Sequence, residues 1–186
     1  STGGRPATAA AQGREWSVLI RGGTVVDGTG AAGYTADVAI RGDRIVAVSR
    51  TPLDPAKAVR EVEARGLVVA PGFIDLHAHI ESLLSMPDAK SAVTQGVTLT
   101  LGGPDGGGPN PLGPYLARAD SAPLGLNVAY LIGHNSIRQA VMGTEDRAPT
   151  PDELARMVAM VRRGMGDGAF GISTGLRYVP GFYAKT

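Results

Sequence analysis

The chain has 186 residues, and its 18 basic and 17 acidic side chains give a formal net charge of +1. This balance provides no basic surface that would attract nucleic acid or another polyanion. Cysteine is absent, which excludes disulfides and thiolate metal ligands, and no apolar run approaches the roughly 20 residues of a membrane-spanning helix. We therefore expect neither nucleic acid nor a membrane among the partners.

Residues 1–15 are predicted to form a flexible tail, because the first 13 are small or polar and show no apolar period. The chain starts with Ser1 rather than methionine, which is compatible with the mature start of an exported protein or with a trimmed chain. We expect a periplasmic or secreted location, with a cytoplasmic location as the alternative.

Residues 16–69 are predicted to form a small, mostly antiparallel β-domain, because short apolar runs alternate with turn residues. The pair Gly42-Asp43 is typical of a two-residue β-hairpin turn between strands at 37–41 and 44–48. The other strands are expected at 17–21, 24–26, 59–63 and 67–69.

From residue 70 to residue 186 the pattern changes to buried strands that alternate with helices, which predicts parallel β/α units. Thr150, Pro151 and Glu153 give the clearest helix start, a capping box with proline in the first turn. Strands are predicted at 73–76, 96–101, 127–132 and 169–173, and helices at 86–95, 115–119 and 151–165.

These four β/α units correspond to the first half of a (β/α)8 TIM-like barrel. A complete barrel typically needs about 250 residues, and half of one would leave two unpaired edges and an exposed apolar inner face. We therefore expect a second chain that carries the C-terminal half of the barrel. A smaller open α/β sheet is the alternative.

The most informative motif is the pair His77 and His79, which closes the apolar run at 70–79. In an extended strand these side chains share one face about 6–7 Å apart, so they can bind one divalent metal. Asp75 lies deeper on that face, where we expect a hydrogen bond rather than direct ligation. Two surface histidines at the end of a strand are the alternative, since two ligands do not complete a metal site.

Four segments resemble the amidohydrolase superfamily, and specifically its N-acyl-D-amino-acid deacylase (D-aminoacylase) branch. Residues 22–30 are similar to the start of its small β-sandwich, 70–79 to its first barrel strand, 95–98 to the beginning of its second, and 168–183 to its fourth. The resemblance implies an α/β fold class, with a small N-terminal β-sandwich portion followed by the first half of a (β/α)8 TIM-like barrel.

The resemblance also implies a metal-dependent amidohydrolase with one or two zinc ions at the barrel mouth. His77 and His79 match the family's two histidines on the first strand. Members of this branch can carry a metal-ligating cysteine after the second strand, and Asp105 stands there in this chain. A carboxylate is a competent zinc ligand, although Asp105 could simply form the turn. Lys185 is interpreted as a surface lysine and not as the carboxylated lysine of other branches.

Four further residues are candidates for substrate contact: Arg177, Tyr178, Tyr183 and His134. Arg177 offers a guanidinium for a substrate carboxylate, and the two tyrosines offer aromatic walls with a polar tip. The alternatives are that the tyrosines anchor their loop and that His134, at the end of the third strand, bonds to backbone.

The predicted function is hydrolysis of a linear amide, the deacylation of a small-molecule N-acyl-D-amino acid or related amide. The family's remaining ligands and its general base lie on later strands, so activity is expected only when the rest of the barrel is supplied. A homo-oligomer is compatible with these features. The alternatives are hydrolysis of a cyclic amide, as in hydantoinases and dihydropyrimidinases, hydrolysis of a dipeptide, and a non-catalytic half-barrel that serves as a structural or binding partner.

Overall fold

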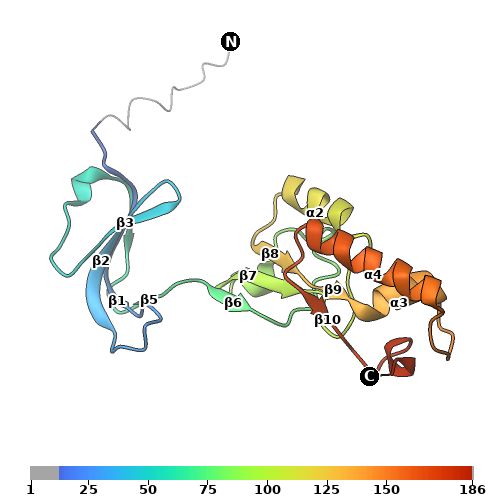
Figure 1. Cartoon of the computed structure of the whole chain (residues 1–186). Coiled ribbons are helices and arrows are strands. Elements are labelled where there is room, and N and C mark those ends of the chain that lie inside the picture. The colour runs from blue at the N-terminus through green and yellow to red at the C-terminus, as the bar shows by residue number, and fades with distance from the viewer. Residues whose placement is uncertain (1–12, 186) are drawn as a thin grey trace, which may run out of the picture. The chain divides into compact units, whose positions relative to one another are not determined.

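The computed structural model describes residues 13–185 and divides the chain into two compact units, Ser1–Pro71 and Gly72–Thr186 (Figure 1). Most of the tail predicted at 1–15 lies outside the described residues. Among the described residues, no helix combines the length and apolar character needed to cross a membrane.

The N-terminal unit contains a five-stranded sheet with the order β3-β2-β1-β4, in which β5 also pairs with β1. The strands are β1 (Trp16–Val25), β2 (Tyr34–Arg41), β3 (Arg44–Ser49), β4 (Ala58–Glu63) and β5 (Val68–Val69). The β1–β2 and β2–β3 pairs are antiparallel, whereas β4 and β5 run parallel to β1. The sheet is therefore mixed rather than mostly antiparallel, because the chain crosses from β3 to the far side of β1 instead of forming another hairpin.

Two local features of this sheet can be compared with the sequence pattern. The predicted hairpin at Gly42-Asp43 is confirmed, with Arg41 opposite Arg44. The predicted break at Gly22-Gly23 is wrong, because β1 continues through it with a shift of register. Gly22 has a φ of +65°, which glycine adopts without strain, and its N–H donates to Asp37 Oδ1 at 2.8 Å. The register shift is thus a β-bulge, which Asp37 on the neighbouring strand β2 stabilises through this hydrogen bond.

The second unit contains parallel strands that neighbour one another in chain order. Strands β6 (Phe73–Asp75), β7 (Val97–Gly102) and β8 (Asn127–Tyr130) form one parallel sheet. After one residue the chain resumes as β9 (Ile132–Gly133), which pairs in parallel with β10 (Ile172–Ser173). All four predicted strand regions are present, although the fourth is reduced to two paired residues.

The helices of this unit agree with the sequence pattern where local signals are strong. Helix α4 (Pro151–Gly166) has the predicted capping box, in which Thr150 and Glu153 bond to each other's main-chain N–H. Helix α2 (Leu112–Ser121) is longer than predicted, whereas α1 (Lys90–Val93) is a single turn preceded by Ala89 in a left-handed conformation. Helix α3 (His134–Met142) was not predicted, because it follows β9 directly and has no side-chain cap.

The core of the second unit lies between its strands and its helices. It is formed by buried side chains from α2, β8, β9, α3, α4 and the segment before β10, namely Leu112, Tyr130, Ile132, Ile137, Met142, Met157 and Ala169. In contrast, several large apolar residues of β6, β10 and their flanks are exposed, among them Phe73, Ile74, Leu76, Phe170 and Ile172. The helices therefore bury the apolar side chains of β8 and β9, whereas apolar side chains on and beside β6 and β10 remain exposed.

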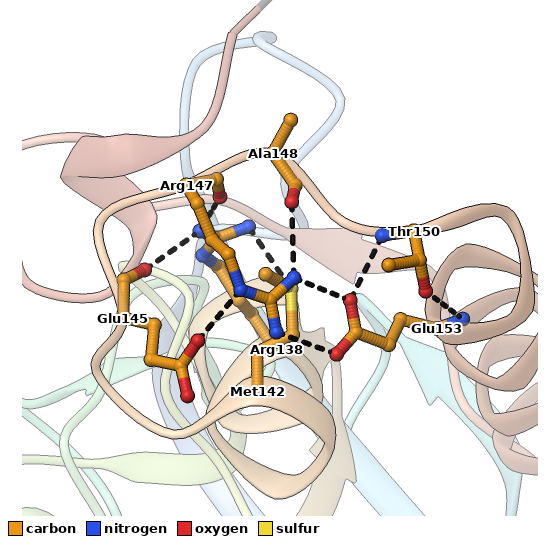
Figure 2. A network of polar contacts seen from close by, with 7 residues as sticks. All are labelled: Arg138, Met142, Glu145, Arg147, Ala148, Thr150 and Glu153. Carbon is orange, nitrogen blue, oxygen red and sulfur yellow. Dashed lines mark hydrogen bonds and ion pairs between the residues drawn. The ribbon is translucent and has the colours of Figure 1, made fainter.

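A polar network joins α3 to the start of α4 (Figure 2). Arg138 is 2% exposed and donates to the main-chain oxygens of Glu145 at 3.1 Å and Arg147 at 2.7 Å, with a further contact to Met142 Sδ at 3.5 Å. The Arg147 guanidinium donates to both carboxylate oxygens of Glu153, at 2.6 and 2.7 Å, and to the Glu145 carboxylate at 2.6 Å. These contacts fix the loop between the two helices.

Candidate metal centre

The first strand of the second unit delivers two histidines to its C-terminal end. Strand β6 ends at Asp75, whose Oδ1 accepts the main-chain N–H of His77 at 3.0 Å. An aspartate that captures the N–H two residues ahead forms a turn and stops the strand. The alternation of side chains had suggested that both histidines lie within the strand. In the structure they lie just beyond its end. Their rings are still close, with centroids 5.8 Å apart and planes inclined by 68°.

Asp105, from the loop after β7, faces both histidines. Its Oδ2 lies 3.3 Å from His77 Nε2 and 3.4 Å from His79 Nε2, and one ligand atom from each residue lies within 4.8 Å of the others. Tetrahedral ligands about 2.0–2.1 Å from a zinc ion lie roughly 3.3–3.4 Å from one another. The carboxylate therefore lies at zinc-ligand spacing from each imidazole, and all three donor atoms are close enough together to bind one divalent ion.

The backbone around Asp105 has an unusual conformation. Asp105 has a φ of +55°, and Gly103 and Gly106 on either side have φ values of +76° and +77°. Few residues other than glycine adopt this left-handed region, although aspartate and asparagine tolerate it best. Gly103 is also tightly packed, since a Cβ there would lie 2.4 Å from the Leu131 carbonyl oxygen. These left-handed residues reverse the direction of the chain after β7, so the Asp105 carboxylate faces the two histidines.

Glu81 is a residue that the sequence patterns did not single out. Its Oε1 lies 3.3 Å from His79 Nδ1, while Nε2 of the same ring faces Asp105. A carboxylate on the far nitrogen of a metal-binding histidine fixes the tautomer and orientation of the ring. Its position two residues after His79 is the only sequence signal that could have pointed to it.

A cavity of about 550 Å³ opens beside the histidines. It is lined by residues of the β6–α1 segment, including Asp75, His77 and His79, together with Thr100 of β7 and Leu126, which directly precedes β8. Both imidazoles are more than half exposed, so the cluster is accessible from this space.

The other predicted site residues lie elsewhere in the unit. His134 is the first residue of α3, and with Tyr183 and Lys185 it lines a second cavity of about 320 Å³ that does not include His77 or His79. Arg177 and Tyr178 are exposed on the segment between β10 and η2 (Gly181–Tyr183). Substrate contact by these four residues stays a prediction.

The family follows from a comparison of the whole sequence. The family model described as amidohydrolase family matches residues 60–185. This chain belongs to the amidohydrolase family. The matched region contains every residue of the cluster described above, and it includes all of the second compact unit except its last residue.

Three relatives define the branch of the amidohydrolase family. The chain is 37% identical to D-aminoacylase from Alcaligenes xylosoxydans xylosoxydans, over 92% of this chain and 40% of that protein. A solved structure of D-aminoacylase, studied for its binuclear metal centre, matches with a TM-score of 0.83 and 37% identity, over 91% of this chain and 40% of that one. N-acyl-D-glutamate deacylase from Bordetella bronchiseptica, solved with zinc and a phosphonate inhibitor, matches with a TM-score of 0.82 and 34% identity, with the same coverage.

These comparisons confirm the resemblance to the D-aminoacylase branch and the predicted fold class. The amidohydrolase chain spans about 40% of the length of these relatives. Its parallel strands, in the order β6, β7, β8 and then β9 with β10, accordingly represent the beginning of a larger barrel.

Proposed function

We propose that this chain is the N-terminal part of a metal-dependent amidohydrolase that deacylates N-acyl-D-amino acids. The observation that carries the proposal is the cluster of His77, His79 and Asp105 at the ends of β6 and β7, with 3.3–3.4 Å between the carboxylate and each Nε2. Active sites of such barrels lie at the C-terminal ends of the strands. The relatives at 37% identity support the choice of substrate class.

Each residue of the cluster has a distinct role in this proposal. His77 and His79 would bind the metal through Nε2, and Asp105 through Oδ2. A bound divalent metal supplies a Lewis acid for the amide carbonyl and lowers the pKa of a water molecule toward about 7. Glu81 holds the ring of His79, and the Asp75 carboxylate holds the main chain of His77.

We propose zinc as the metal, because two imidazoles and one carboxylate are typical zinc ligands. A carboxylate can also bridge two ions, so Asp105 is the residue that would connect a second metal to the first. The zinc-containing relative supports this choice.

We further propose that the polypeptide corresponding to the rest of the relatives completes both the barrel and the site. Three protein ligands can hold a catalytic zinc ion with water in the fourth position, and the family resemblance implies further ligands and a general base on later strands. Phe73 and Leu76 near one outer strand, and Phe170 before the other, are 61–75% exposed, which is apolar surface that further β/α units would bury. Arg177 is proposed to meet the substrate carboxylate in that completed site.

Metal binding by the purified chain tests the proposal most directly. Isothermal titration with Zn²⁺ should show one tight site in the wild-type chain and none in the His77→Ala, His79→Ala double variant. His134→Ala is the matched control, because this histidine lines the other cavity and should leave binding unchanged. Equal binding by the double variant and the wild type would refute the site.

The activity itself is tested after co-expression with the C-terminal part of the barrel. Release of acetate from N-acetyl-D-amino acids, and not from their L-enantiomers, is the expected result. Turnover of hydantoin or of dipeptides instead would assign the chain to a different amidohydrolase reaction.

A further inference from the structure

We propose that Ser173 and Asn135 are positioning residues that hold the turn at 103–106 so that the Asp105 carboxylate faces the histidines. The inference rests on the proposed function, because it assigns Asp105 the role of a metal ligand. It adds two residues, from β10 and α3, that neither contact the histidines nor belong to the ligand set.

Ser173 closes the turn from both sides. Its Oγ accepts the N–H of Gly106 at 3.0 Å and donates to the carbonyl oxygen of Gly103 at 2.5 Å. These two groups flank Asp105 in the sequence, and Ser173 lies 67 and 70 residues away from them. One hydroxyl from the fourth strand therefore joins the two ends of the turn that follows the second strand.

Asn135 ties the same turn to the segment after β10. It is 8% exposed, and its main-chain N–H donates to the Gly106 carbonyl oxygen at 2.9 Å. Its side-chain Nδ2 donates to the Gly175 carbonyl oxygen at 3.0 Å. The neighbouring Ser136 adds a bond from its hydroxyl to the Gly108 carbonyl oxygen at 3.0 Å. The start of α3 thus binds two consecutive parts of the loop that carries Asp105.

The packing around these bonds is tight enough to transmit a displacement. A Cβ on Gly175 would lie 1.8 Å from the carbonyl oxygen of Asp105, and one on Gly181 would lie 2.1 Å from Asn135 Oδ1. A Cβ on Gly106 would lie 2.6 Å from the same Oδ1 atom. The main chain of Asp105 is therefore in direct contact with the segment after β10, while its side chain faces His77 and His79.

This support matters because Asp105 has a backbone conformation that a free chain rarely adopts. A residue other than glycine with a φ of +55° keeps that conformation when the surrounding structure imposes it. Without the bonds to Gly103 and Gly106, the turn is free to relax, and its carboxylate then spends less time near the two Nε2 atoms. A ligand that is not held in place binds metal more weakly.

The test measures Co²⁺ binding to the purified full chain by titration calorimetry and by visible absorption of the bound ion. Ser173→Ala should weaken Co²⁺ binding by roughly 10-fold or more, the range typical of removing a group behind a ligand. Its spectrum should shift toward that of Asp105→Ala, whereas Ser173→Thr, which keeps a hydroxyl, should restore the wild-type spectrum. Ser121→Ala is the matched control, because this exposed hydroxyl bonds only within α2, to the Arg118 carbonyl oxygen.

The outcomes separate the inference from the proposed function. If Asp105→Ala weakens Co²⁺ binding but Ser173→Ala does not, the positioning role is overturned and the metal site stands. If the wild-type chain binds no Co²⁺ even after co-expression with the C-terminal part of the barrel, or binds it equally well after His77→Ala, the proposed function fails and this inference fails with it. If Ser173→Ala does not fold, Asn135→Ala decides by the same comparison, because it removes the side-chain donor to Gly175 without placing a charge against that carbonyl oxygen.

Discussion

Replacing Arg138 with methionine tests how much the buried guanidinium contributes to the stability of the second unit. The change keeps an unbranched side chain of similar length but removes the hydrogen bonds to the main-chain oxygens of Glu145 and Arg147. Hydrogen bonds from a charged donor contribute about 1.5–3 kcal/mol each, so the two together correspond to roughly 3–6 kcal/mol. The saved cost of burying a charge offsets part of this, which leaves an expected loss of about 2–4 kcal/mol.

For a unit the size of Gly72–Thr186, with about 2.1 cal/mol/K of unfolding entropy per residue, that loss corresponds to a decrease in melting temperature of roughly 8–16 °C. Thermal unfolding followed by circular dichroism measures the decrease directly. Arg156→Met is the matched control, because it makes the same replacement at an exposed position of α4 and is expected to change stability by less than about 0.5 kcal/mol. An Arg138→Met protein that is as stable as the wild type, or more stable, would refute the reasoning and would show that burying the guanidinium costs as much as its bonds contribute.

Four further changes test the site and the loops around it. Asp105→Ala should weaken Zn²⁺ binding by about 100-fold or more, because it removes a ligand. Glu81→Gln should weaken Zn²⁺ binding by about 10–100-fold, because it removes the negative charge next to His79 Nδ1. Calorimetric titration measures both effects. Gly103→Ala should lower the melting temperature and weaken Zn²⁺ binding, since its Cβ would meet the Leu131 carbonyl oxygen at 2.4 Å. Arg147, with the Thr150 N–H, lowers the pKa of Glu153 to about 2. A group with a lowered folded-state pKa stabilises the protein above its unfolded value, here 4.5, and loses that contribution as the pH falls toward about 2. Glu153→Gln should therefore reduce the difference in stability between pH 6 and pH 3, and an unchanged difference would contradict the assignment.

The sequence was most informative where structure is determined within a few residues. Thr150 and Glu153 predicted the start of α4 correctly, because a capping box satisfies donors three residues apart. The two-residue turn at Gly42-Asp43 was predicted for the same reason. In contrast, α3 has no cap of its own and is stabilised by Ile137 and Met142, which pack in the shared core. A helix that depends on tertiary packing and not on capping residues cannot be predicted from a local sequence pattern.

The candidate site shows the same division. His77 and His79 were recognisable from their spacing, and Asp105 from its place in a family pattern, and the structure brings these three together. The role of Ser173 could not be predicted from the sequence, because its hydrogen bonds join residues about 70 positions apart. A serine at the end of a strand is also common and does not by itself indicate such a role. The end of β6 at Asp75 was also missed, because alternation of side chains does not reveal where a carboxylate captures the main chain.

The presence of aspartate at position 105 has a consequence for how such a centre withstands oxidants. Peroxide converts a metal-binding thiolate step by step into sulfenic and sulfinic acids, and the later steps cannot be reversed by ordinary thiols. A carboxylate has no such chemistry, and a chain without cysteine has no thiol anywhere to supply it. A centre built on His77, His79 and Asp105 has no sulfur donor, so this route of inactivation by peroxide is closed to it.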